Sequence, residues 1–201
     1  DAGQRCAAAS RIIIFEAVYE EFKKRFLDNI STLKVGTEDT DDYGAIISES
    51  RVDSIVSAID TTRHEGATLL AGGKRIDRAG YFLEPTVFEN ASPSGYFSQN
   101  EIFGPVVALY RAHDLEEAID LANHSPYLLS SAIHTRAPSR ASEFIRRYEG
   151  GVVRVNGTTH GSEPHVPFGG EGLSGNGWRE PGLPALVFYS SLKQVSIDHY
   201  Q

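Results

Sequence analysis

The one cysteine of this 201-residue chain lies in a glycine-led stretch near its start, Gly3-Gln4-Arg5-Cys6, and small residues follow as far as Ser10. A thiolate is a nucleophile, and a turn in which backbone N–H groups converge lowers the pKa of a thiol and can hold an oxyanion. Cys6 is therefore a candidate catalytic nucleophile. An inert buried cysteine is the alternative, and it is the commoner situation for a lone cysteine.

A carboxylate beside a fixed turn is the second candidate, in Glu101-Ile102-Phe103-Gly104-Pro105. A carboxylate in that setting can accept hydrogen bonds from the hydroxyl groups of a ribose. The alternative is an ordinary turn that leads into the apolar run 106–110.

The third candidate is a long segment rich in glycine and proline, residues 157–184, which contains Pro167-Phe168-Gly169-Gly170. Such glycine density fits a backbone that passes close to a ligand or to another segment. A connection of this length is usually functional, although a surface loop is the alternative.

Apolar periodicity predicts the elements that position these motifs. Helices are expected over Val18 to Ile30, Val52 to Ile59, Leu115 to Ala122 and Ala141 to Tyr148, and strands over 11–15, 67–71, 106–110, 129–134, 152–155 and 187–199. Because Pro85 cannot donate a hydrogen bond to a sheet, Tyr81 to Phe88 is expected to be an edge strand or an extended loop. The alternation predicts an α/β domain with a mainly parallel, open sheet flanked by helices.

Composition excludes several functional classes. The chain has 19 basic and 27 acidic residues and a net charge of −8, which argues against nucleic acid as a partner. No apolar run approaches the ~20 residues of a membrane helix, so no membrane partner is expected. One cysteine allows no internal disulfide, which fits a cytoplasmic protein, and the histidines lack the spacing of metal ligands, so no metal is expected.

In this order and at these separations, the three motifs resemble the C-terminal part of the aldehyde dehydrogenases. Tyr81-Phe82-Leu83-Glu84-Pro85-Thr86 and Val155-Asn156 add to the resemblance, which covers nearly the whole chain. It implies a cysteine-bearing catalytic domain over 1–186 and an oligomerisation strand over 187–201.

The resemblance also implies roles for single residues. Cys6 would attack the aldehyde carbonyl to give a thiohemiacetal, hydride would leave to NAD or NADP, and the resulting thioester would be hydrolysed. Glu101 would bind the nicotinamide ribose, Phe103 would lie near the nicotinamide, and Phe168 would line the substrate pocket. Trp178 departs from the family pattern, in which Arg-Glu directly follows Ser-Gly-x-Gly.

The family's cofactor-binding fold, general-base glutamate and oxyanion asparagine lie N-terminal to the cysteine and have no counterpart in these residues. The chain also has no methionine. It is therefore expected to be a fragment of a longer enzyme and to be inactive alone. A non-catalytic remnant that acts as a subunit or interaction module is the alternative. An in-frame cofactor domain encoded upstream of Asp1 would favour the enzyme, and a start codon there would favour the remnant.

The segment between Asn156 and Phe168 is similar to the substrate-anchoring loop of dehydrogenases for carboxylate-bearing semialdehydes. Gly161 and Ser162 stand where those loops place a glycine and a small residue, and backbone N–H groups with a hydroxyl can bind a carboxylate. A solvent loop that contains Gly-Ser is the alternative. A CoA-acylating aldehyde dehydrogenase also remains open.

The chain end has the alternation of a strand, with Val195, Ile197 and His199 on one face. A terminal strand is an open edge that invites pairing with another chain. In the resembled family this strand joins a neighbouring subunit, so a homodimer or homotetramer is expected.

Overall fold

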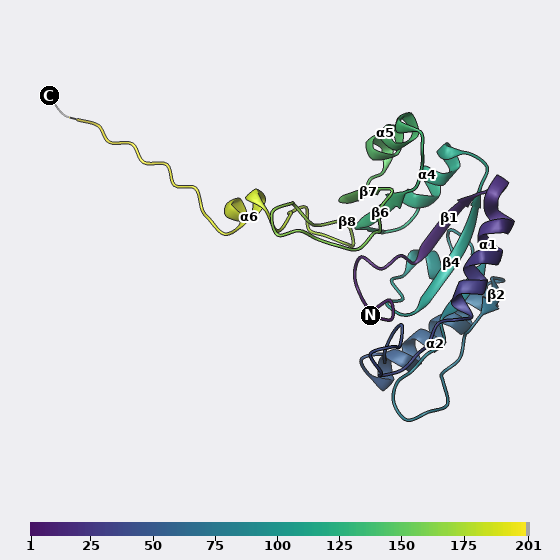
Figure 1. Ribbon diagram of the computed structural model, residues 1–201. Helices are drawn as coiled ribbons and strands as arrows, with labels where there is room; N and C mark the ends of the chain where they lie inside the picture. The colour runs from purple at the N-terminus through teal and green to yellow at the C-terminus, as the bar shows by residue number, and fades with distance from the viewer. Residues whose placement is uncertain (200–201) are drawn as a thin grey trace.

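The computed structural model describes residues 1–199, and helices alternate with strands along most of the chain (Figure 1). The elements are, in order, β1 (Arg11–Phe15), α1 (Glu16–Ile30), α2 (Glu49–His64), β2 (Thr68–Ala71), β3 (Thr86–Glu89), α3 (Tyr96–Gln99), β4 (Val106–Ala112), α4 (Leu115–Asn123), β5 (Tyr127–Leu128), β6 (Ser130–Ile133), α5 (Pro138–Arg147), β7 (Val152–Val155), β8 (Glu171–Gly172) and α6 (Leu183–Phe188).

The central sheet has four strands in the order β1-β4-β3-β2. Strands β1, β4 and β3 are parallel, with Arg11 opposite Ala108 and Thr86 opposite Val106, and only β2 is antiparallel. A second, two-stranded sheet pairs β6 with β7 in parallel, and β5 pairs with β8. The prediction of an α/β fold with a mainly parallel sheet is confirmed.

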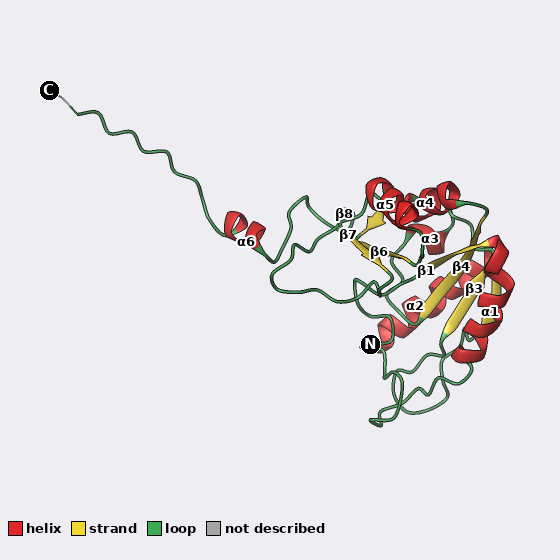
Figure 2. Ribbon diagram, turned by 45° about the horizontal axis from the view of Figure 1, so that its top comes forward, coloured by secondary structure: helices red, strands yellow, loops and turns green. Residues whose placement is uncertain are grey.

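Helices cover both faces of the central sheet (Figure 2). Leu109 of β4 packs in a cluster with Tyr19 of α1, whereas Ala108 and Tyr110 pack on the other face in a cluster with Ile55 of α2. This alternation follows from the two-residue period of a strand. Helix α4 packs against β1 and β4, and α5 packs against α4.

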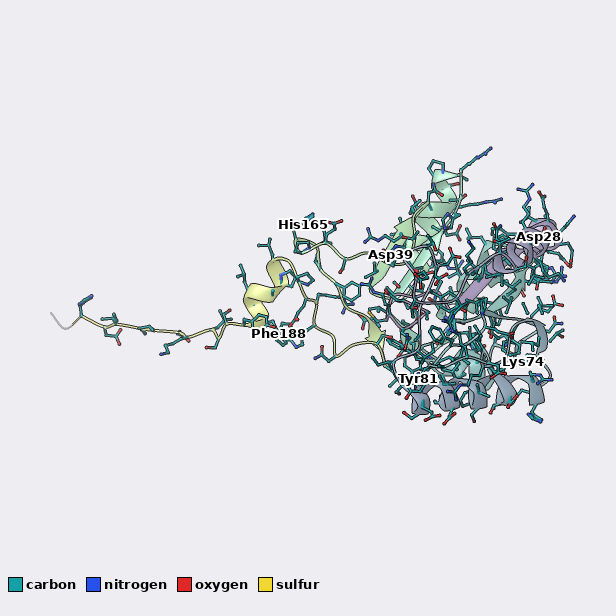
Figure 3. The ribbon with its side chains drawn as sticks, turned by 60° about the horizontal axis from the view of Figure 1, so that its bottom comes forward. Asp28, Asp39, Lys74, Tyr81, His165 and Phe188 are labelled. Atoms are coloured by element: carbon teal, nitrogen blue, oxygen red, sulfur yellow. The ribbon has the colours of Figure 1, made fainter. Side chains whose placement is uncertain are left out.

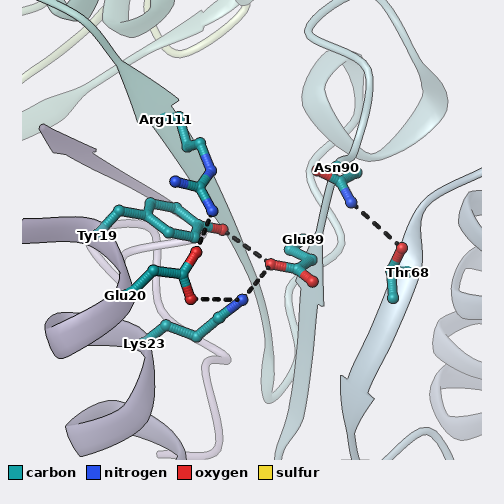
Figure 4. A network of polar contacts seen from close by, with 7 residues as sticks. All are labelled: Tyr19, Glu20, Lys23, Thr68, Glu89, Asn90 and Arg111. Atoms are coloured by element: carbon teal, nitrogen blue, oxygen red, sulfur yellow. Dashed lines mark hydrogen bonds and ion pairs between the residues drawn. The ribbon is translucent and has the colours of Figure 1, made fainter. Parts of the chain in front are cut away.

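A polar network joins α1 to strands β3 and β4 of the sheet (Figure 4). The buried Tyr19 hydroxyl donates to Glu89 Oε2 at 3.2 Å, and Lys23 Nζ lies 3.0 Å from the same oxygen. Arg111 pairs with Glu20, and its guanidinium lies 3.7 Å from the centre of the Tyr19 ring. Burial, followed by the charge of Glu89 and its hydrogen bond, raises the pKa of Tyr19 to about 12.

One prediction about an individual element is wrong, and another is confirmed only in part. Thr86–Glu89 is an inner strand rather than an edge, because Pro85 lies just before β3 and no sheet hydrogen bond is required of it. The helix over 16–30 matches its predicted apolar face only in part: Phe26 and Ile30 pack against the core cluster that contains Tyr19, but the first half of the stripe does not. Val18 is 51% exposed and Phe22 is 36% exposed, while Tyr19 is the residue that α1 buries.

The strand predicted over 187–199 is not present within this chain. Val187 and Phe188 end the short helix α6, and residues 190–199 form no element, while 200–201 lie outside the described residues. Figures 1 and 3 show this segment extending far from the domain, beyond Phe188. A lone chain offers no sheet edge at that distance, so the apolar alternation has no strand to pair with here.

The predicted helix signals in the second half of the chain are confirmed. Asp114 caps α4, because its carboxylate accepts from the backbone N–H of Glu117 at 2.9 Å. Pro138 occupies the first turn of α5, where no N–H is needed. No helix within residues 1–199 is long and apolar enough to cross a membrane.

Candidate active site

Cys6 lies in a tight, exposed loop that precedes β1. Two backbone hydrogen bonds of 3.0 Å close its turns. The Gln4 N–H donates to the Asp1 carbonyl, and the Ala8 N–H donates to the Arg5 carbonyl. We call residues 3–10 the nucleophile loop. Within residues 1–199, the N–H groups of Cys6 and Ala7 make no backbone hydrogen bond.

The Gln4 side chain holds this loop to the segment before α2. Its Oε1 accepts from the Ile47 N–H at 2.9 Å, and its Nε2 donates to the Ala45 carbonyl at 3.2 Å. A primary amide that uses both its donor and its acceptor fixes the backbone two residues before Cys6.

The nucleophile loop lies directly against the Glu101–Pro105 turn. A Cβ atom on Gly3 would be 2.0 Å from the carbonyl oxygen of Gly104, and Gly3 has a φ of +70°. Only glycine combines this backbone conformation with so close an approach. The first two motifs of the sequence, about a hundred residues apart, therefore meet at these two glycines.

The turn that carries Glu101 is itself constrained. Phe103 has a left-handed backbone with a φ of +56°, and the Arg51 guanidinium donates to the Ile102 carbonyl at 2.8 Å. Glu101 is exposed, and no hydrogen bond or ion pair within residues 1–199 occupies its carboxylate. The arrangement leaves this carboxylate free to accept hydrogen bonds from a ligand.

One cavity of about 1020 Å³ joins these features. Cys6, Glu101 and Phe103 all line it. Other parts of its wall come from β1, β6, α1, α3, α4 and α5, from residues 157–160, and from Ser174. Two of the predicted regions, the cysteine stretch and the glutamate turn, thus share a single site, and the third region reaches it at residues 157–160 and at Ser174.

The other predicted substrate residues lie outside the lining of this cavity. Gly161 and Ser162 directly follow the wall formed by 157–160 without being part of it. Phe168 is joined to Glu180 by two backbone hydrogen bonds of 2.7 and 2.8 Å, and it does not line the cavity either. The roles of these three residues remain predictions.

Trp178, at the departure from the family pattern, and Arg179, which follows it, contact different parts of the chain. Arg179 pairs with Glu171 and donates to the Gly170 carbonyl at 3.2 Å, so it braces the glycine-rich segment internally. The Trp178 ring packs edge-on against Phe188 of α6, with 6.0 Å between ring centres.

Sequence reasoning missed three residues that position the site. One is Gln4, and a second is Arg11, whose guanidinium donates to the carbonyls of Leu121 at 2.6 Å and Ala122 at 2.9 Å. Burial lowers the pKa of Arg11. Its positive charge lies beside the C-terminal carbonyls of α4, where the helix dipole favours a cation. The third is Thr159, which bonds to the nucleophile loop. None of these long-range contacts has a local sequence signal.

The chemistry open to this site is nucleophilic addition. An exposed thiol beside two free backbone N–H groups can attack a carbonyl carbon while the developing oxyanion is held. No group of three metal-ligating side chains is found within residues 1–199.

Comparison with known proteins identifies the family. Residues 1–195 match the model of the aldehyde dehydrogenase family, so the chain belongs to that family. The α-ketoglutarate semialdehyde dehydrogenase of Haloferax volcanii is 41% identical over 198 residues, which is 96% of this chain and 41% of that protein. The 2,5-dioxopentanoate dehydrogenase of Saccharolobus solfataricus is also 41% identical, over 96% of this chain and 41% of that protein.

Solved structures agree in fold. The betaine aldehyde dehydrogenase of Staphylococcus aureus, solved with NAD+, matches with a TM-score of 0.90 and 35% identity, over 94% of this chain and 38% of that one. The chain thus spans about two fifths of the length of these relatives. The resemblance inferred from the three motifs is confirmed.

Proposed function

We propose that this chain supplies the cysteine-bearing catalytic segment of an NAD- or NADP-dependent aldehyde dehydrogenase that oxidises a carboxylate-bearing semialdehyde. One observation carries the proposal: the Gly3–Gly104 contact brings Cys6 and Glu101 to a single cavity. The semialdehyde relatives support the substrate class. An NAD+-bound structural relative and an NADP+ succinate-semialdehyde dehydrogenase of Mycobacterium avium, 38% identical to this chain, support the cofactor class.

Cys6 performs the covalent step. Its thiolate adds to the aldehyde carbon, a C–S bond forms, and the carbonyl electron pair moves to oxygen. The N–H groups of Cys6 and Ala7 donate to that oxyanion, which stabilises the thiohemiacetal. After oxidation the acyl group stays on Cys6 as a thioester, and attack by water releases the acid and regenerates the thiolate.

The free carboxylate of Glu101 fits a ribose, because it is exposed and has both oxygens available. Phe103, in the same turn, offers its ring to the flat nicotinamide. NAD or NADP, when bound, supplies the acceptor for the hydride.

Gly161 and Ser162 would bind the substrate carboxylate. They follow the cavity wall directly, so a semialdehyde whose carbonyl lies at Cys6 would extend its acid group toward them. Phe168 would lie beside the carbon chain of the substrate, between its carbonyl and its acid group. The lone cysteine fits a reducing, cytoplasmic setting.

The test is aldehyde-dependent formation of NADH or NADPH by the enzyme in which this chain is joined to a cofactor-binding domain, with α-ketoglutaric semialdehyde compared against an uncharged aldehyde. Cys6→Ala should abolish turnover and leave the circular dichroism spectrum unchanged. In the wild-type chain, the semialdehyde should also slow alkylation of Cys6. Turnover by Cys6→Ala contradicts the proposal, and a requirement for CoA would identify an acylating enzyme instead.

A further inference from the structure

The nucleophile loop is held from two sides of Cys6. On the N-terminal side Gln4 bonds to Ala45 and Ile47, as described above. On the C-terminal side the Thr159 hydroxyl donates to the carbonyl of Ala7 at 2.7 Å, across 152 positions of sequence. Within residues 1–199, Thr159 is the one side chain that hydrogen-bonds to the backbone between Arg5 and Ser10.

The segment that carries Thr159 is fixed to the domain in turn. It begins after β7, where the Asn156 side chain accepts from the Thr135 N–H at 2.8 Å and donates to the Thr135 carbonyl at 3.0 Å. It ends where the Arg154 guanidinium donates to the Gly161 carbonyl at 2.5 Å. Thr159 therefore projects from a segment that is anchored before and after it.

We infer that Thr159 is a positioning residue that locks the nucleophile loop to the segment leading into Gly161 and Ser162. Its hydroxyl fixes the carbonyl of Ala7, the residue directly after Cys6, so the direction of the thiol depends on the conformation of 157–161. The inference rests on the proposed function, because it takes Cys6 as the nucleophile. It adds that the substrate-binding segment and the nucleophile move as one unit.

Loss of this hydroxyl would leave the Ala7 carbonyl without its partner and free the loop on that side. Since Cys6 is already exposed, a freed loop should present the thiol to small reagents more often. The same mobility should reduce the fraction of time in which the thiol is oriented for attack on a bound aldehyde. One hydrogen bond corresponds to an effect of about two- to tenfold.

The experiment measures the rate constant for alkylation of Cys6 by iodoacetamide, which is unambiguous because the chain has one cysteine. Thr159→Val should raise this rate about two- to tenfold, and Thr159→Ser, which keeps the hydroxyl, should restore the wild-type value. Thr158→Val is the matched control, because the Thr158 hydroxyl bonds within its own segment, to His160 at 3.3 Å. A pH profile of each rate separates a changed thiol pKa from changed access.

An unchanged rate in folded Thr159→Val overturns the inference, as does an equal increase in Thr158→Val. If Thr159→Val does not fold, the alkylation rate of Thr159→Ser is the test. It must match that of the wild type, and a different rate overturns the inference. Alkylation needs neither aldehyde nor cofactor, so failure of the proposed function is seen separately, as turnover by Cys6→Ala. In the active enzyme, Thr159→Val should lower kcat and leave the KM for the cofactor unchanged.

Discussion

Gly3 lies against the carbonyl of Gly104, so closely that a single added carbon would sit 2.0 Å from that oxygen. This contact joins the loop of the thiol to the turn of Glu101, and it explains why position 3 must be glycine; Gly104 is required for a different reason, because its added Cβ would lie 2.7 Å from Ile55 Cδ1. The same two residues therefore offer a test of how the site is assembled.

Gly3→Ala should destabilise the protein by about 2–4 kcal/mol, because it adds left-handed strain to an overlap with backbone atoms. Gly66→Ala is the matched control, since Gly66 also has a positive φ of +97° but no atom within 4 Å of its added Cβ. That variant should lose only about 1–2 kcal/mol. Urea unfolding measures both, and equal losses would mean that the Gly104 contact is unimportant.

In the enzyme that includes the cofactor-binding domain, Glu101→Gln should weaken binding of NAD or NADP or slow hydride transfer, because each charge-assisted hydrogen bond to a ribose hydroxyl contributes on the order of 1.5–3 kcal/mol. Cofactor titration and single-turnover kinetics measure the two effects. If both stay unchanged while the KM for the aldehyde rises, Glu101 belongs to substrate binding.

Stability should fall at alkaline pH as Tyr19 begins to titrate. Its pKa of about 12 in the folded protein lies above the ordinary tyrosine value of 10.0, so the unfolded chain loses this proton first. The contribution of Tyr19 is therefore complete below pH 10 and is lost between pH 10 and 12. Tyr19→Phe should show a shallower decline in the free energy of unfolding, measured by urea titration at each pH. A decline as steep as in the wild type would show that Tyr19 is not responsible.

Much of the fold follows from local signals. The apolar run of β1, the Asp114 cap and Pro138 each specify their element through neighbouring residues. The errors arise where distant residues decide. The position of β3 depends on where β2 and β4 lie, and the buried face of α1 depends on the partners that Tyr19 finds on the sheet.

The site divides in the same way. The thiol and the carboxylate stand out in the sequence because their types and surroundings suggest chemistry. Gln4 was visible within its motif, yet its role requires Ala45 and Ile47, and that of Thr159 requires Ala7. Residue spacing alone cannot reveal contacts that form only after the chain has folded.

The C-terminal segment should mediate assembly. Beyond the domain, several large apolar side chains are exposed: Leu186, Val187, Phe188, Leu192, Val195 and Ile197. An extended segment of this kind fits the sheet edge of a second copy. Deletion of residues 190–201 should therefore shift the mass in light scattering from a dimer or tetramer toward a monomer. An unchanged oligomeric mass would place the contact elsewhere.

Chemical crosslinking tests whether Cys6 and Glu101 share one site. In the variant Glu101→Cys, a short bis-maleimide should bridge the new thiol to Cys6 within one chain, because both positions line the same cavity. Asp28→Cys, near the end of α1 and outside that cavity, is the control and should take up two separate labels (Figure 3). Mass spectrometry distinguishes one bridging reagent from two single additions. An efficient intramolecular bridge in Glu101→Cys alone is the predicted result, and its absence, or an equal yield in Asp28→Cys, would contradict a common site.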